Sequence, residues 1–176
     1  MFSGVVSIPQ RYGNYRILFM NSKRPIIAIG PHWYVSLFGL GLIGGGSLAF
    51  NYSLWPYLHG VSLAVSVLVS LISSLSYLYL ILSDPGIVPK ATVDYIDVEG
   101  SIKGECGVCK TWSSREGVVH CDDCDVCIEG YDHHCPWVGK CIGKRNLYVF
   151  YVFVASVPTL YVVMTVVGVF VSMKIN

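Results

Sequence analysis

The stretch from His120 to Pro136 reads His-Cys-Asp-Asp-Cys-Asp-Val-Cys-Ile-Glu-Gly-Tyr-Asp-His-His-Cys-Pro. It holds four of the seven cysteines and three of the five histidines of this chain. The remaining cysteines, Cys106, Cys109 and Cys141, flank it closely. Because thiolate and imidazole are the ligands that zinc prefers, this part of the chain is a candidate metal-binding region.

The sequence on either side of this region is apolar. Charged residues make up only 13% of the 176 residues, about half of the usual share in a soluble domain. The segments 25–83 and 147–173 contain no Lys, Arg, Asp or Glu, and all eleven acidic residues lie between Asp84 and Asp132. This segregation predicts a mainly α-helical membrane protein with one polar, zinc-binding loop of short strands. The net charge of +1 offers nothing to nucleic acid, which we do not expect as a partner.

Uncharged runs of 18 residues or more are long enough for a helix to cross a bilayer of about 30 Å. Asp84-Pro85-Gly86 is expected to end the second such run, because the residue before proline is disfavoured in a helix. The predicted organisation is a cytosolic N-terminal arm (1–32), a first transmembrane helix (33–50), a lumenal loop (51–60), a second helix (61–83), a cysteine-rich zinc domain (84–146) and a third helix (147–173).

The basic residues predict the orientation. The N-terminal arm carries four Lys or Arg and the cysteine-rich loop seven, whereas the loop 51–60 carries none. Basic loops face the cytosol, so we expect the arm and the zinc loop to be cytosolic. Stable disulfides are rare in that reducing compartment. We expect an integral protein of the endomembrane system, in the Golgi, endoplasmic reticulum or plasma membrane.

The spacing of the cysteines and histidines favours two metal centres and one surplus pair. Six cysteines and two histidines are enough for two closed zinc sites, each with three sulfurs and one imidazole. Cys135 and His133 are then left over, and a cytosolic cysteine close to a histidine is a candidate nucleophile. A purely structural zinc module is the main alternative. A redox role for the Cys-x2-Cys pairs and a cross-braced ubiquitin-ligase module fit the spacing less well.

The order of these residues resembles the signature of the DHHC-type protein S-acyltransferases, or palmitoyltransferases. The resemblance rests on Asp132-His133-His134-Cys135, the following Pro-Trp-Val and Cys-Ile-Gly, and the upstream Cys-x2-Cys and His-Cys-x2-Cys-x2-Cys groups. Asn146, Phe150 and the Asp-Pro-Gly sequence at 84–86 also match the family. The chain lacks the family's fourth span and its Thr-Thr-x-Glu motif, so we expect a short or truncated member.

The resemblance implies a role for each matching residue. Cys135 would accept a fatty acyl group from acyl-CoA and pass it to a cysteine of a membrane-associated protein substrate, with His133 as base and Asp132 orienting it. Trp137 would border the acyl chain, and Lys144 and Arg145 would meet the phosphates of CoA or of lipids. Two structural zinc ions would be held by the following residues: Cys106, Cys109, His120 and Cys127 for one, and Cys121, Cys124, His134 and Cys141 for the other.

The chemistry of the region is consistent with these roles. A thiol is only a few per cent thiolate at neutral pH, and a zinc ion with three thiolates carries a net negative charge that opposes a further thiolate nearby. A neighbouring base is therefore the better way to activate Cys135. A catalytically inactive, zinc-stapled membrane scaffold is the second hypothesis. His32 and His59 are expected at the membrane interface without a chemical role.

Overall fold

The computed structural model describes residues 10–20, 24–88, 106–109 and 117–175. The chain divides into two compact units, each built from two separated parts of the sequence. The first comprises Met1–Val35 and Ile81–Leu147, and the second comprises Ser36–Leu80 and Tyr148–Asn176. The segments 1–9, 89–105 and 110–116 of the predicted arm and zinc domain lie outside the described residues.

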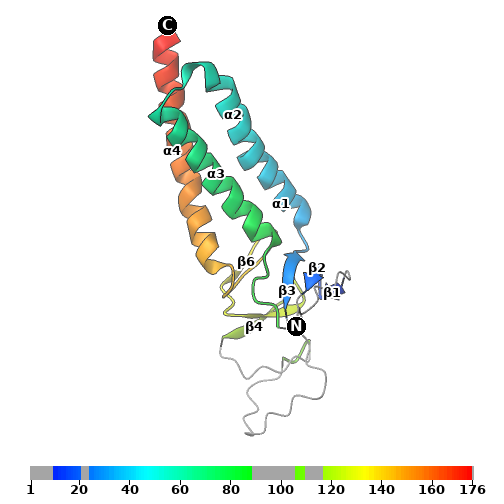
Figure 1. Ribbon diagram of the computed structural model, residues 1–176. Helices are drawn as coiled ribbons and strands as arrows, with labels where there is room; N and C mark the ends of the chain where they lie inside the picture. The colour runs from blue at the N-terminus through cyan, green and yellow to red at the C-terminus, as the bar shows by residue number, and fades with distance from the viewer. Residues whose placement is uncertain (1–9, 21–23, 89–105, 110–116, 176) are drawn as a thin grey trace, which may run out of the picture. The chain divides into compact units, whose positions relative to one another are not determined.

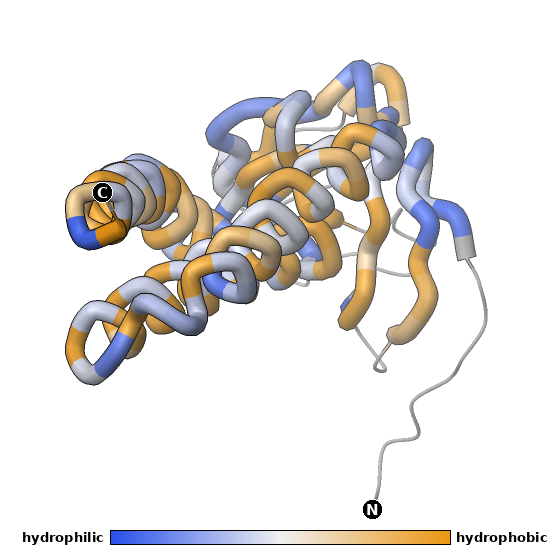
Figure 2. The backbone as a smooth tube through the Cα atoms, turned by 90° about the horizontal axis from the view of Figure 1, so that it is seen from above, coloured by the Kyte–Doolittle hydropathy of each residue, from blue (hydrophilic) through white to orange (hydrophobic). Residues whose placement is uncertain are grey.

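The second unit is helical. Its elements are α1 (Trp33–Leu40), the π-helical turn η1 (Gly41–Gly45), α2 (Gly46–Leu54), the 3-10 turn η2 (Trp55–Tyr57), α3 (Val61–Leu82) and α4 (Leu147–Ile175) (Figure 1). Three stretches are long and apolar enough to cross a membrane: Trp33–Tyr57, Val61–Leu82 and Leu147–Ile175. Strongly hydrophilic colour is confined to short parts of these helices in Figure 2. The predicted number of spans is therefore present among the described residues.

The first helical stretch continues past Phe50, where the sequence analysis placed its end. Asn51 donates to Ser70 Oγ at 3.0 Å and accepts from Ser66 Oγ at 2.8 Å, so its side chain is paired with α3 rather than with water. A polar group within a bilayer needs such internal partners. The polar residue that suggested a loop thus joins two helices. Farther along, the rings of Tyr77 and Phe153 pack α3 against α4 with 4.9 Å between centroids.

The first unit is built from three small antiparallel sheets. The N-terminal sheet has the order β1-β2-β3, and two hairpins, β4-β5 and β6-β7, follow α3. The strands are β1 (Gln10–Tyr12), β2 (Tyr15–Met20), β3 (Pro25–Ile29), β4 (Val118–Cys121), β5 (Val126–Glu129), β6 (His133–Cys135) and β7 (Lys140–Ile142). The residues predicted as an N-terminal arm therefore form a sheet from Gln10 onward.

The N-terminal sheet and the two hairpins share one hydrophobic core. Tyr15, Ile17 and Ala28 from the sheet are fully buried against Ile87, Val126 and Ile128 and against three cysteines of the zinc loop. Two-stranded hairpins are marginal by themselves, so this shared core is what lets such short strands persist. The N-terminal sheet is consequently part of the module that holds the cysteines.

Lys140 joins three separate segments of the first unit. Its side chain is fully buried, and Nζ donates to the backbone oxygens of Ala28 at the end of the N-terminal sheet, and of Ile81 and Ser83 at the end of α3. Burial lowers the pKa of Lys140 to about 7. A lysine is seldom buried without partners, and here three carbonyls satisfy its three donors.

We predict that replacing Lys140 with Met lowers the stability of the chain in detergent micelles. The change leaves three inward-facing carbonyls without their donor, at a cost of at least about 2 kcal/mol. We expect the melting temperature to fall by about 4–8 °C. The control is Lys144→Met, because the Lys144 side chain is 66% exposed and Glu129, its partner, keeps Arg145 Nη2 at 3.6 Å when Lys144 is removed. Equal melting temperatures for the two variants would contradict the prediction.

Candidate active site and metal centres

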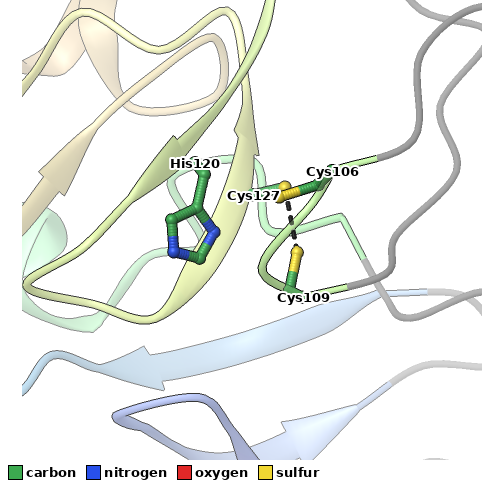
Figure 3. A group of neighbouring side chains, drawn as sticks. All are labelled: Cys106, Cys109, His120 and Cys127. Atoms are coloured by element: carbon green, nitrogen blue, oxygen red, sulfur yellow. Dashed lines mark hydrogen bonds between the residues drawn. The ribbon is translucent and has the colours of Figure 1, made fainter.

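The first candidate metal centre brings the Cys106–Cys109 segment together with the β4-β5 hairpin. Cys106, Cys109, His120 and Cys127 offer ligand atoms that all lie within 4.8 Å of one another. His120 and Cys127 face each other across the β4-β5 hairpin, and Cys109 Sγ lies 3.1 Å from Cys127 Sγ (Figure 3). Zinc–sulfur bonds of about 2.3 Å place the corners of a tetrahedron about 3.8 Å apart. The group therefore has the composition and nearly the size of a closed zinc site.

His120 supports this reading independently of the sulfurs. Among the side chains that the structure describes, its Nδ1 is the one buried nitrogen or oxygen without a hydrogen-bond partner. Its other nitrogen, Nε2, lies 3.6 Å from a carboxylate oxygen of Asp122, which is a common outer partner for a metal-bound imidazole. Leaving a buried nitrogen unpaired is costly, and a cation at the centre of the group would satisfy it.

The second candidate centre has the same donor set. Cys121, Cys124, His134 and Cys141 again lie within 4.8 Å of one another. Nδ1 of His134 is 3.3 Å from Cys124 Sγ and 3.6 Å from Cys121 Sγ. These two groups are the ones that the resemblance implied. Among the residues that the structure describes, all six ligand cysteines and both ligand histidines are thus brought together in fours.

The ionisation of the sulfurs shows why a cation fits. In the second centre a hydrogen bond with Cys141, 3.3 Å away, lowers the pKa of Cys124 to about 6. The same contact raises the pKa of Cys141 far above its usual range, with burial adding to the effect. The two sulfurs share one proton because adjacent thiolates repel each other. Zinc would remove this conflict, since it lets all three thiols ionise together.

Strand β6 directs the predicted metal ligand His134 and the predicted reactive pair, His133 and Cys135, to opposite faces. Side chains alternate between the two faces of a strand, so His133 and Cys135 leave one face and His134 leaves the other. His134 pairs with Cys141 across the β6-β7 hairpin, and both belong to the second metal group. Cys135 is 6% exposed and is not in either group. The Nδ1 atom of His133 is 2.7 Å from Asp132 Oδ2. A cysteine, a histidine and a carboxylate therefore stand next to a residue of a candidate metal group.

The Asp-Pro-Gly sequence builds the turn that follows α3. Asp84 Oδ1 accepts hydrogen bonds from the backbone N–H groups of Gly86 and Ile87, both at 2.8 Å, and its other oxygen pairs with Arg145. Gly86 has a φ of 119°, which only glycine adopts without strain, and its Cα lies against the backbone of Glu129. The motif thus fixes the start of the polar region to the residues just before α4.

The residues expected to meet CoA are partly engaged within the first unit. Lys144 Nζ lies 2.7 Å from Glu129 Oε1, and Arg145 pairs with Asp84 while a second nitrogen lies 3.6 Å from Glu129 Oε2. The Lys144 side chain is 66% exposed, so it can still reach a phosphate. Trp137, in the β6-β7 turn, is 74% exposed.

Three residues of the N-terminal part contact the second centre, including His32, which was expected to lie at the membrane interface without a chemical role. Asn14 N–H donates to the Cys124 carbonyl at 2.9 Å, the Tyr15 hydroxyl lies 3.5 Å from Cys124 Sγ, and His32 Nδ1 lies 3.3 Å from His134 Nε2. The Tyr15 and Cys124 pair is separated by 109 positions. No local motif could report such a pair, because its members are unremarkable in their own stretches of sequence.

Comparison with known proteins supports the sequence resemblance. Residues 101–176 match the family model described as DHHC palmitoyltransferase. The chain is 34% identical to "Palmitoyltransferase ZDHHC5" of Canis lupus familiaris over a 146-residue alignment that covers 69% of this chain and 19% of that protein. It is 38% identical over 109 residues to "Palmitoyltransferase ZDHHC14" of Homo sapiens, which covers 46% of this chain and 22% of that protein.

These relatives are much longer than the chain. The human "Palmitoyltransferase ZDHHC18" is 38% identical over 104 residues, and the match covers 26% of it. The chain thus spans about a fifth to a quarter of the curated relatives it matches. The matched part includes Asp132, both ligand histidines and all seven cysteines. Together with the two metal-binding groups and the three apolar helices, this match shows that the chain carries, at residues 101–176, a domain of the DHHC palmitoyltransferase family.

Proposed function

We propose that this chain is a membrane-embedded protein S-acyltransferase that works through an acyl thioester on Cys135. The observation that carries the proposal is the arrangement of β6, where Cys135 shares a face with His133 while His134 belongs to a metal group. The hydrogen bond from His133 to Asp132 adds the orienting carboxylate of a nucleophile–base pair. All the other cysteines of the chain belong to the metal groups.

The reaction needs two exchanges of a thioester. In the first, His133 takes the proton of the Cys135 thiol, the sulfur attacks the acyl carbonyl of acyl-CoA, and the CoA sulfur leaves with that proton. In the second, His133 takes the proton of a substrate cysteine, whose sulfur attacks the acyl carbonyl, and Cys135 leaves and is protonated again. Asp132 at Nδ1 holds the imidazole in the tautomer that can accept a proton at Nε2.

The membrane supplies the affinity for the acyl chain. Each methylene kept in apolar surroundings contributes about 0.8 kcal/mol, so a long acyl chain that remains among the helices or lipids favours binding strongly. The exposed Trp137 follows Cys135 closely and is suited to border that chain. We assign Lys144 and Arg145 to the phosphates of CoA, with the zinc loop facing the cytosol, where CoA esters and the cysteines of membrane-associated substrates are accessible. The compartment we propose is the endomembrane system.

Zinc is structural in this proposal. Both groups offer four protein ligands, which leaves no open position for a substrate. When bound, zinc would fix the loop and keep the ligand thiols ionised, and acyl transfer itself would use the residues of the Asp132–Cys135 stretch. An inactive scaffold with the same zinc groups is the alternative that the following experiments distinguish.

We predict that the 176-residue chain, purified in detergent with radiolabelled palmitoyl-CoA, acquires label that neutral hydroxylamine removes. Cys135→Ser should abolish this label, because a hydroxyl is a far weaker nucleophile and its ester resists hydroxylamine under those conditions. Labelled gels before and after hydroxylamine measure the result. Hydroxylamine-sensitive label that survives in Cys135→Ser would exclude the assignment, and a chain with two zinc ions but no label would select the scaffold.

We predict that removing the base or its partner slows acylation of Cys135 without removing it. His133→Ala and Asp132→Asn should lower the rate by about 10²–10⁴-fold at neutral pH. The rate of His133→Ala should rise steeply as the pH is raised, because hydroxide then ionises the thiol in place of the imidazole. Single-turnover labelling across pH 6.5–9.5 measures this profile. If the rate of His133→Ala stayed below that of the unmodified chain by the same factor at every pH, His133 would not act as a base.

We predict that metal content separates the ligands from the nucleophile. His134→Ala and Cys141→Ala should lose the zinc of the second centre and loosen the loop, because each removes one of four ligands. Cys135→Ala should retain two zinc ions per chain. Elemental analysis of the purified proteins decides between these outcomes. Zinc loss from Cys135→Ala equal to that from Cys141→Ala would make Cys135 a ligand.

A further inference from the structure

The N-terminal sheet touches the second metal group through its backbone. At the β1-β2 turn, Asn14 donates from N–H to the Cys124 carbonyl at 2.9 Å and from Nδ2 to the Asp123 carbonyl at 3.0 Å. The neighbouring Gly13 has a φ of 51°, and a Cβ built there would lie 2.2 Å from the Asp125 carbonyl oxygen. The β1-β2 turn therefore packs directly against the backbone of Cys124 and Asp125, and a side chain at position 13 would not fit.

Tyr15 links two ligands of this centre. Its hydroxyl oxygen accepts a hydrogen bond from Cys141 N–H at 3.1 Å and lies 3.5 Å from Cys124 Sγ. The residue is fully buried, and its hydroxyl has one hydrogen to donate. With Cys124 ionised as a metal ligand, the hydroxyl can donate a hydrogen bond to the Cys124 sulfur. A hydrogen bond of this kind spreads the charge of a metal-bound thiolate.

His32 contacts the imidazole ligand of the same centre. Because Nδ1 of His134 faces the sulfurs, its Nε2 is the nitrogen that carries the proton when the ring is neutral. That Nε2 lies 3.3 Å from Nδ1 of His32, and the rings meet edge to face at 88°. The backbone N–H of His32 donates to the Gly139 carbonyl in the β6-β7 turn at 3.2 Å. His32 Nδ1 is thus positioned to accept a hydrogen bond from the Nε2–H group of His134 and to fix the tautomer of that ring.

We propose that the N-terminal sheet and the residues after it supply the outer shell of the second zinc centre, with Tyr15 and His32 as positioning residues. They act through Cys124 and His134, not on the substrate. Metal ligands are usually held by outer partners of this kind, whose loss weakens metal binding by about 10–100-fold. Because His134 precedes Cys135 in β6, the same contacts also hold the reactive strand in place. The retention of zinc in this loop therefore depends on a segment more than 100 positions upstream.

The experiment measures how fast each zinc ion leaves the full chain in detergent micelles. The chain is purified with two zinc ions, challenged with excess chelator, and followed with a colorimetric zinc indicator. In Tyr15→Phe, which keeps the ring and removes only the hydroxyl, we expect one of the two zinc ions to leave about 10–100-fold faster. In His32→Leu we expect the same. His32→Asn should keep the release slow, because the asparagine side-chain oxygen lies about where Nδ1 of His32 was. That oxygen can accept the hydrogen bond from His134 Nε2–H.

The matched controls lie in the same chain. Tyr12 pairs with Tyr15 directly across β1 and β2 and packs against the same core, so Tyr12→Phe tests for a general effect of losing a hydroxyl in this sheet. His59→Leu tests for a general effect of losing a histidine. Both should release zinc as the unmodified chain does. Melting temperatures at saturating zinc check that Tyr15→Phe and His32→Leu still fold.

Three results would overturn the proposal. Unchanged release from Tyr15→Phe and His32→Leu would mean that these contacts do not hold the metal. Equal acceleration of both zinc ions, or of Tyr12→Phe alongside Tyr15→Phe, would indicate a loss of the fold and not of an outer shell. Failure of His32→Asn to restore slow release would show that the imidazole acts by its shape and not by its hydrogen bond. None of these readouts depends on acyl transfer, so the proposal can fail separately from the proposed function.

Discussion

In β6 the side chains of His133, His134 and Cys135 leave alternate faces of a strand only three residues long. The middle one enters a metal group and the outer two remain on the opposite face. A helix would place the same three residues about 100° apart, and it could not direct neighbours to opposite sides. The two-residue repeat of β structure thus lets one short sequence contribute to a candidate metal centre and to the proposed reactive pair at once.

The hairpins that contain this strand are too small to be stable by themselves. β4-β5 and β6-β7 have three or four residues a strand, and isolated two-stranded hairpins are marginal in water. Two things compensate. The cysteines and histidines are gathered so closely that sulfurs compete for protons, a conflict that a cation removes. The rest of the support comes from the core shared with the N-terminal sheet.

Polar groups placed in apolar surroundings hold the segments of each unit together. In the first unit, Lys140 donates to carbonyls from the N-terminal sheet and from the end of α3. In the second unit, Asn51 binds two serines of α3. Such groups are expensive to bury unless they are paired, so each one specifies a single set of partners. They therefore decide which segments meet, while apolar packing supplies most of the stability.

Features that a short stretch of residues encodes were predictable before the fold was known. Uncharged runs predicted three apolar helices, the Asp-Pro-Gly turn predicted the end of α3, and ligand spacing together with the family resemblance predicted both metal groups. Counting donors also left Cys135 and His133 over as a predicted reactive pair. In each of these predictions, the residues that carried the pattern are the residues that form the helix, the turn or the metal group.

The contacts between distant segments became visible only in the folded chain. The N-terminal residues read as a loose arm, yet they form a sheet whose Tyr15 and His32 lie on the second metal group. Asn51 read as the start of a loop, yet it lies in a helix because its partners are on the next one. Lysine side chains are usually exposed, yet Lys140 is fully buried. Contacts between residues so far apart in the sequence leave no local pattern, because each partner stands in a stretch without any distinguishing motif.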